Sequence, residues 1–143
     1  MARVKVALPA QFPFSTVIPI RITDLNYGGH VGNDAVLSII HEARMQFLAH
    51  YGYSEMHFEG VGLIMADVAI EFKHEAFYGD SIIASVAASD FGKVTFDIYY
   101  KLEKKDGDKI IPVAYAKTGM VCFDYGQKKV VPVPNSIPAR LQQ

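Results

Sequence analysis

Polar residues that could do chemistry cluster in the segment Asp24–Asp34, which reads DLNYGGHVGND. The segment holds two carboxylates, two amides and one imidazole, with three glycines between them. Carboxylate and imidazole groups can exchange protons, and an amide can hold a water molecule or a carbonyl oxygen. From Ala35 onward, apolar residues recur at the spacing of a helix. A polar loop that leads directly into a helix indicates a site at the helix N-terminus, where unpaired backbone N–H groups can stabilise negative charge.

The composition indicates one compact domain that covers residues 1–143. Half of the residues are hydrophobic and a fifth are charged, which argues against disorder. The sequence has no repeat, low-complexity segment or linker, so no domain boundary is predicted. The net charge of −1 argues against nucleic acid as a partner, because there is no basic excess to replace the counterions of phosphates.

The features that bear on location favour the cytoplasm. Cys122 is the single cysteine and lies in the apolar run GMVCFDY, so we expect a buried core residue in a reducing compartment. The N-terminal apolar run is cut short by Pro9, which is too early for a signal peptide. No apolar run approaches the length that spans a membrane, so no membrane partner is expected.

A helix is predicted directly after the polar segment. Its apolar stripe follows the i, i+4, i+7, i+11 spacing and is wide enough for us to expect a largely enclosed helix. The stripe consists of Val36, Ile39, Ile40, Ala43, Phe47 and Leu48. We expect Asn33 or Asp34 to be the N-cap and Gly52 to end the helix.

After this helix the period of the apolar residues changes to two, which is typical of strands. Residues 68–73 (VAIEFK) predict a half-buried strand. Three longer strands are predicted in GDSIIASVAAS, KVTFDIYYKLE and KIIPVAYAKTGMVCFDY, and the Asp-Gly pair in KKDGDK predicts a tight hairpin between the last two. Hairpin-joined strands form an antiparallel sheet, so the expected fold class is α+β, with one long central helix wrapped by a curved antiparallel β-sheet.

Three motifs, taken in order, resemble one family. The first is R-x-x-D-L-N-x-x-G-H-V-x-N, which spans Arg21–Asn33 and is followed by E-A-R on the helix. The second is EFKHEAFYGDSI, and the third is AKTGMVCFDYGQKKVVPVPNSI. Together they are similar to the hotdog-fold thioesterases, in particular to the 4-hydroxybenzoyl-CoA and acyl-carrier-protein thioesterase branch, over about residues 17–141.

The resemblance implies a thioesterase that hydrolyses an acyl-CoA or acyl-carrier-protein thioester with water. It also implies a hotdog domain that forms a homo-oligomer, at least a dimer and up to a tetramer, with the site at the subunit boundary. The backbone amides of Gly32 and Asn33 would polarise the thioester carbonyl, and Gly28 and Gly29 would let the backbone turn and the substrate approach. No metal or cofactor is implied, because coenzyme A or pantetheine arrives as part of the substrate.

One position departs from the family pattern. Where bacterial members of the branch carry their catalytic aspartate, this chain has Asn26. An amide can orient water or donate a hydrogen bond, but it cannot take up a proton at neutral pH. Another group therefore supplies the base, or the chain is a weak or different catalyst, or it is not an enzyme.

Three residues are candidates for the base. Asp24 matches the first acid of the family motif, His30 matches its histidine, and Glu42 lies on the helix among apolar neighbours. Each also has a structural interpretation: a loop carboxylate that accepts backbone N–H bonds, a histidine packed under the helix, and a salt bridge with Arg44 or a lysine of the sheet. The remaining candidates are interpreted as structural: His41, Arg44, His50, His57 and His74.

Two other functions remain open beside hydrolysis. A non-catalytic acyl-thioester binding protein would keep the pocket without the acid. A hotdog enoyl-CoA hydratase would carry a loop like D-x-N-P-x-H, but this chain has DLNYGGH, with Tyr27 in place of proline and one residue too many before His30. Metal enzymes and serine hydrolases are not predicted, because the spacings H-x-x-x-H, C-x-x-C and G-x-S-x-G are absent from the sequence.

Overall fold

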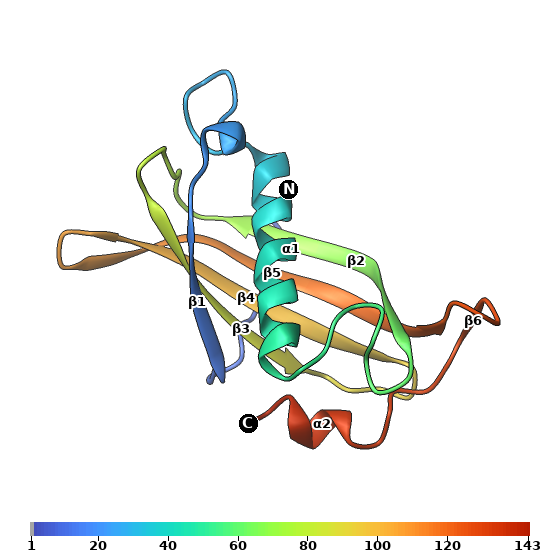
Figure 1. Ribbon diagram of the computed structural model, residues 1–143. Coiled ribbons are helices and arrows are strands. Elements are labelled where there is room, and N and C mark those ends of the chain that lie inside the picture. The colour runs from blue at the N-terminus through green and yellow to red at the C-terminus, as the bar shows by residue number, and fades with distance from the viewer. Residues whose placement is uncertain (1) are drawn as a thin grey trace.

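The computed structural model describes residues 2–143, in which a strand and a long helix precede a run of strands (Figure 1). The elements are β1 (Phe14–Pro19), the 3-10 helix η1 (Ile22–Asp24), α1 (Asn33–His50), β2 (Gly62–Phe72), β3 (Ser81–Ser89), β4 (Thr95–Asp106), β5 (Lys109–Asp124), β6 (Lys129–Val130) and α2 (Ile137–Arg140). Within residues 2–143, no helix combines the length and the apolar character that a membrane crossing requires.

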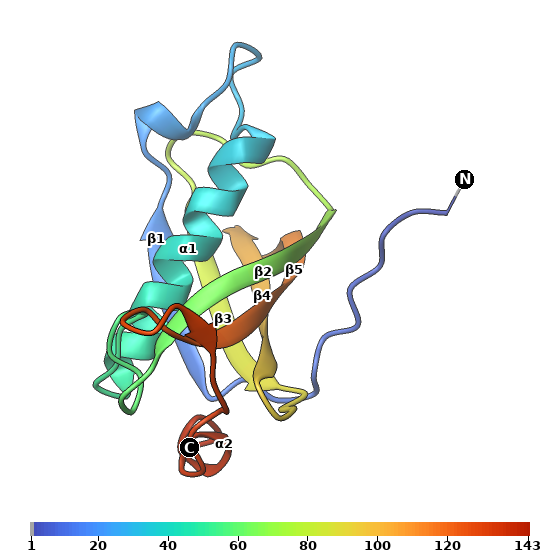
Figure 2. The same cartoon turned by 90° about the vertical axis from the view of Figure 1, so that its right-hand side faces the viewer.

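The strands form one antiparallel sheet of six strands, in the order β1-β3-β4-β5-β2, with β6 paired to β5. The helix α1 lies along one face, and the sheet curves around it (Figures 1 and 2). In the predicted hairpin between β4 and β5, Asp106 pairs with Lys109 and Gly107 has a φ of +62°, so Gly107 and Asp108 make the turn. The predicted α+β class, with a curved antiparallel sheet around one long helix, is confirmed.

The apolar stripe of α1 packs against the sheet as predicted, because all six of its residues are buried. The opposite side of the helix is open: Ser38, His41 and Glu42 are exposed, so the expected enclosure of the helix is wrong. The reason is that a single sheet layer covers one side of a helix only. The predicted end is confirmed, since α1 stops at His50 and Gly52 follows with a φ of +84°.

The start of α1 differs from the prediction. Asn33 is already helical, and Gly32 is the N-cap, without a side-chain cap. The reason lies in the backbone, because the Gly32 N–H donates to the Asp24 carbonyl oxygen at 3.1 Å and the Val36 N–H donates to the Gly32 carbonyl oxygen at 3.1 Å. These two bonds fix the start of the helix earlier than either predicted cap would.

The strand β2 forms one edge of the sheet, and its second half is uncovered. Val68 and Phe72 are 39% and 51% exposed, although their alternation predicted a half-buried strand. A bulge lies between Met65 and Asp67, where the Asp67 carboxylate accepts the Gly119 N–H at 2.9 Å. An edge strand with exposed apolar side chains offers unpaired backbone groups to another chain.

The core between α1 and the sheet contains a cluster of aromatic rings. Phe47 is fully buried, and its ring meets those of Phe14 and Tyr51 edge to face, with centroids 5.9 and 5.3 Å apart. Cys122 is buried in the same core, as predicted, and burial raises the pKa of its thiol to about 11. The aromatic contacts join α1 to β1.

Phe47→Ala should lower the free energy of unfolding by about 3–5 kcal/mol, because it removes a fully buried ring and leaves a cavity between α1 and β1. Urea-induced unfolding followed by circular dichroism measures the change. Met56→Ala, at an exposed position, is the control and should change the free energy by less than about 0.5 kcal/mol. Equal stability of the two variants would contradict this packing.

Candidate functional site

The loop between η1 and α1 is held by its own backbone and by the Asn26 side chain. Asn26 Oδ1 accepts the Gly28 N–H at 2.8 Å, and the Asn26 N–H donates to the His30 carbonyl oxygen at 2.9 Å. Gly29 has a φ of +82°, which glycine adopts without strain. Because its side-chain oxygen is engaged, Asn26 keeps the hydrogens of Nδ2 as donors for another group.

The side chains of Asn26 and His30 converge on Gly28. A Cβ atom at Gly28 would lie 3.2 Å from Asn26 Oδ1 and 3.3 Å from His30 Nε2. His30 Nε2 also lies 3.7 Å from Glu75 Oε1, and His30 Nδ1 lies 3.3 Å from the Val31 carbonyl oxygen. The structure therefore brings two of the predicted residues together and adds a carboxylate beside them.

The first turn of α1 presents backbone donors. The Val36 N–H makes the first hydrogen bond of the helix, and no side chain at the N-cap, Gly32, accepts a hydrogen bond from the first turn. The N–H groups of residues 33–35 therefore have no partner within residues 2–143. The Gly32 amide, predicted as a donor to the substrate, is instead bound to the Asp24 carbonyl oxygen. Of the two predicted donors, only the Asn33 amide is available.

A cavity of about 200 Å³ lies beside this start of the helix. Its lining comes from the loop, from α1, from the end of β2 and the segment that follows it, and from β5, and it includes His30, Asn33, Val36, Phe72, His74 and Val113. Lys73 and Glu75 line it as well. None of Phe72, His74 and Glu75 was predicted as a site residue, although all three lie in the second family motif, EFKHEAFYGDSI. The fold brings that motif to the start of the helix.

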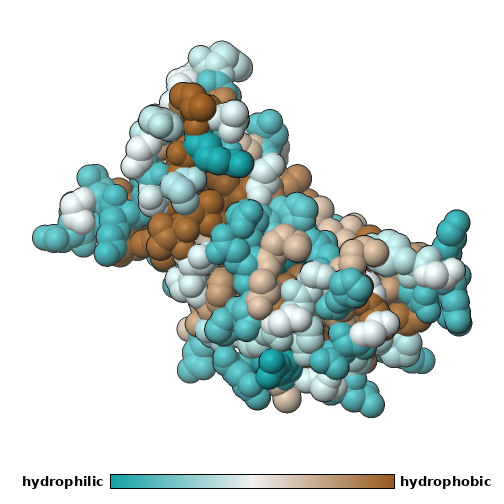
Figure 3. Space-filling view, in the orientation of Figure 1, coloured by the Kyte–Doolittle hydropathy of each residue, from teal (hydrophilic) through white to brown (hydrophobic). Residues whose placement is uncertain are grey.

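Asp24 and Glu42 line a different space, a groove of about 360 Å³ between β1 and α1. Apolar surface gathers on this side of the molecule (Figure 3). Asp24 is 4% exposed and accepts the Arg21 N–H at 2.7 Å and the Arg21 guanidinium at 3.1 Å, which raises the pKa of Arg21. Glu42 accepts a hydrogen bond from Gln46 Nε2 at 2.7 Å. The four predicted catalytic residues are thus divided, and neither of these two carboxylates lines the cavity beside His30.

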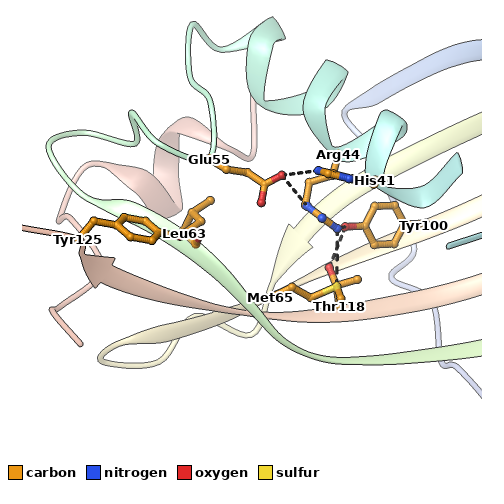
Figure 4. A network of polar contacts seen from close by, with 8 residues as sticks. All are labelled: His41, Arg44, Glu55, Leu63, Met65, Tyr100, Thr118 and Tyr125. Carbon is orange, nitrogen blue, oxygen red and sulfur yellow. Dashed lines mark hydrogen bonds and ion pairs between the residues drawn. The ribbon is translucent and has the colours of Figure 1, made fainter. Parts of the chain in front are cut away.

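Arg44 belongs to a separate network between α1 and the sheet (Figure 4). Its guanidinium donates to Tyr100 Oη at 3.3 Å, and Tyr100 Oη shares a hydrogen bond of 2.7 Å with Thr118 Oγ1. Burial raises the pKa of the Tyr100 hydroxyl, so this group stays neutral and can both accept and donate. The network fastens the middle of the helix to β4 and β5.

Glu55 extends this network to the loop after α1. Glu55 Oε1 lies 3.6 Å from Arg44 Nε and 2.8 Å from His41 Nε2 (Figure 4). The Arg44 side chain is 5% exposed, and its Nε has no hydrogen-bond partner within residues 2–143. The structural interpretation of Glu42, a salt bridge with Arg44 or a lysine of the sheet, is wrong within residues 2–143. Arg44 reaches inward toward the sheet, while Glu42 bonds to Gln46 on the open side of the helix.

Comparison with known proteins shows which family the chain resembles. Residues 20–141 match the family described as the thioesterase-like superfamily. Two relatives are named 1,4-dihydroxy-2-naphthoyl-CoA hydrolase. That of Microcystis aeruginosa is 31% identical over 82% of this chain and 85% of the relative, and that of Thermosynechococcus vestitus is 27% identical over 86% and 84%. The fold is similar to the crystal structure of an aspartate-to-asparagine mutant of 4-hydroxybenzoyl-CoA thioesterase complexed with 4-hydroxybenzoyl-CoA, with a TM-score of 0.81 and 15% identity over 90% of this chain and 97% of that one.

The chain belongs to the thioesterase-like superfamily. Its curved sheet and long helix form a hotdog fold. It is an enzyme that hydrolyses thioesters. The predictions of the family, the fold and thioester hydrolysis are confirmed.

Tyr100→Phe should lower the free energy of unfolding by about 1–3 kcal/mol, because Arg44 and Thr118 lose the buried hydroxyl that they share. Tyr99→Phe is the matched control, since Tyr99 is only half-buried and its hydroxyl donates to the exposed Asp90. Its loss should be smaller, at about 0.5–1.5 kcal/mol. Urea-induced unfolding compares the variants, and a larger loss for Tyr99→Phe would refute the role given to the buried network.

Proposed function

We propose that the protein hydrolyses coenzyme A thioesters of hydroxylated aromatic acids. By their names, the relatives and the structural neighbour described above act on or bind 1,4-dihydroxy-2-naphthoyl-CoA and 4-hydroxybenzoyl-CoA. The cavity at the start of α1 supports this class, since the ring of Phe72 and the side chains of Val36 and Val113 give it aromatic and apolar walls. Walls of this kind bind an aromatic acyl group, and the polar His30 and Asn33 beside them can bind its polar groups.

The observation that carries the proposal is the set of unpaired amides at the start of α1, next to the cavity. When water adds to a thioester, negative charge moves onto the carbonyl oxygen, and donors that are already in place stabilise it. The amides of residues 33–35 also lie at the positive end of the helix dipole. The Nδ2 group of Asn26 is a further donor, because the other atom of the amide, Oδ1, already accepts the Gly28 N–H and holds the side chain in place.

In this proposal the proton of the attacking water goes to His30. The imidazole lines the cavity, and the Glu75 carboxylate, 3.7 Å from Nε2, stabilises the cation that forms. As the tetrahedral intermediate collapses, the C–S bond breaks and the proton passes to the departing sulfur, so that the free acid and coenzyme A are released. Asp24 and Glu42 line the other groove, and we give them no step in the reaction.

A cytoplasmic location forms part of the proposal. Cys122 is the single cysteine of the chain and a free thiol. Chains that do not depend on disulfides are typical of reducing compartments.

The proposal also includes a homodimer formed along β2. This strand is an open edge, and Phe72 at its end is both exposed and part of the cavity wall. A second subunit paired along this edge would cover Val68 and would lie beside Phe72, at the border of the cavity.

Thiol release from a panel of coenzyme A thioesters tests the substrate class. The panel consists of the 4-hydroxybenzoyl, 1,4-dihydroxy-2-naphthoyl, benzoyl and hexanoyl thioesters. We expect the highest kcat/KM for the two hydroxylated aromatic substrates. A preference for the hexanoyl thioester would overturn the aromatic class, and no turnover of any of them would overturn the proposed function as a whole.

Asn26→Ala should lower kcat by about 10²–10³-fold, which is the usual effect of losing one donor to a developing oxyanion. Stability should fall by about 1 kcal/mol or less, since the variant loses a single hydrogen bond to Gly28. Steady-state kinetics and urea-induced unfolding measure the two effects. Tyr27→Ala, at the exposed neighbouring residue, is the control and should retain both activity and stability. If both variants keep the wild-type kcat, Asn26 has no part in the mechanism.

Asn26→Asp separates the two roles that the family pattern allows at this position. One carboxylate oxygen can keep the bond to the Gly28 N–H, so the loop should stay in place. With His30 as the base, the new negative charge lies near the developing oxyanion, and kcat should fall. If kcat instead rises above that of the wild type, the site lacks a base, and the step assigned to His30 is wrong.

Val68→Arg should convert the dimer to a monomer of 15.8 kDa, because it places a charge on the apolar part of the open edge. Ile110→Arg is the matched control, since Ile110 is 48% exposed at the far hairpin between β4 and β5. Sedimentation at micromolar concentration should show a dimer for the wild type and for the control. A monomeric wild type would refute the dimer without affecting the assignment of the reaction.

A further inference from the structure

A second cavity, of about 510 Å³, lies between the N-terminal part of the chain and the end of β2. Residues 2–5 line one side, and residues 70–72 line the other. Phe72 also lines the cavity at the start of α1. The two cavities therefore share a wall at the end of the open edge strand.

The N-terminal segment, residues 2–13, lies on the side of the sheet that is opposite α1 (Figure 2). The Val6 N–H donates to Glu71 Oε1 at 3.0 Å. Lys101 Nζ lies over the ring of Phe12, 4.9 Å from its centroid. These two contacts hold the segment against β2 and β4.

Cationic side chains gather around the second cavity. Arg3 and Lys5 are exposed, and their spacing puts both on one side of an extended chain. Lys73 Nζ lies 2.7 Å from Glu71 Oε2 and 5.0 Å from the centroid of the Tyr115 ring. Lys73, a backbone N–H and Lys5 lower the pKa of Glu71, which indicates that Lys5 is near this carboxylate. Lys5 and Lys73 lie around the Glu71 carboxylate, and Arg3 lines the same cavity, so positive charges outnumber the single carboxylate here, in a chain whose net charge is −1.

We infer that Arg3, Lys5 and Lys73 bind the phosphates of the adenosine 3′,5′-diphosphate part of a coenzyme A thioester. The inference rests on the proposed function, because it requires the thioester carbonyl to lie at the start of α1. When the acyl group occupies the first cavity, the nucleotide of the substrate must lie outside that cavity. Phe72 lines both cavities, so the second cavity is next to the first and can receive the nucleotide. Guanidinium and ammonium groups bind phosphate oxygens through charge-assisted hydrogen bonds. The N-terminal segment is then a nucleotide-binding part of the enzyme.

The double variant Arg3→Ala/Lys5→Ala tests this assignment with two substrates that share one acyl group. The first is 4-hydroxybenzoyl-CoA, and the second is the N-acetylcysteamine thioester of the same acid, which lacks the nucleotide. We divide kcat/KM for the coenzyme A thioester by kcat/KM for the N-acetylcysteamine thioester. In the double variant this ratio should fall by about three- to tenfold, as the loss of two exposed charge contacts predicts, and the change should lie in the KM for the coenzyme A thioester. Salt should lower the same ratio in the wild type and have less effect in the variant.

Lys128→Ala/Lys129→Ala, at the last residue of the turn before β6 and the first residue of β6, is the matched control and should keep the wild-type ratio. An unchanged ratio in Arg3→Ala/Lys5→Ala would overturn the inference. So would a loss confined to acyl-carrier-protein thioesters, because the segment would then contact an acidic carrier protein and not the nucleotide.

Binding of adenosine 3′,5′-diphosphate, measured by calorimetry, tests the same residues without catalysis. It should weaken by about three- to tenfold in Arg3→Ala/Lys5→Ala and should stay unchanged in the control. Equal binding by the wild type and this variant would overturn the inference. If no coenzyme A thioester is hydrolysed but the binding still depends on Arg3 and Lys5, the proposed reaction fails and the phosphate site stands.

Discussion

The burial of one side of α1 against the curved sheet is the interaction on which the rest of the structure depends. It removes the apolar stripe from water and fixes the direction of the helix across the strands. The first amides of any helix lack carbonyl partners within it, and here the amides of residues 33–35 stay unpaired within residues 2–143 and are left for a ligand. The packing of α1 therefore decides where the start of the helix, and with it the site, lies. The loop before α1 adds the polar side chains at that place.

The loop before α1 meets two demands at once. It must turn tightly enough for the Asp24 carbonyl oxygen to accept the Gly32 amide, and it must keep polar groups beside the cavity. Asn26 serves the first demand, because its side-chain oxygen accepts the Gly28 N–H and closes the turn, and its nitrogen stays free to donate. His30 and Asn33 serve the second, since both line the cavity. An amide therefore suits this position for structural reasons, independently of whether the position also needs an acid.

The parts of the fold that depend on local periodicity could be predicted from the sequence. The stripe on α1 and the alternation of the strands report burial directly, since a residue's neighbours along an element decide its face. The N-cap could not be predicted, because it depends on a backbone bond between Gly32 and Asp24 that the loop must first fold to make. The partner of Arg44 was also missed, since Tyr100 lies 56 residues away in sequence while Glu42 lies two. His74 could not be predicted as a site residue, because it comes close to the start of α1 only when the fold places the end of β2 beside it.

The burial of Cys122 has a consequence for an enzyme whose product is itself a thiol. Each hydrolysis of a thioester releases a free sulfhydryl group next to the protein, and under oxidising conditions such a product can form a mixed disulfide with a reactive cysteine. Cys122 is enclosed in the core, and its pKa of about 11 keeps it almost entirely protonated at neutral pH. The chain therefore offers its own product no thiolate to capture, and it is protected from this form of self-inactivation by the packing of its core alone.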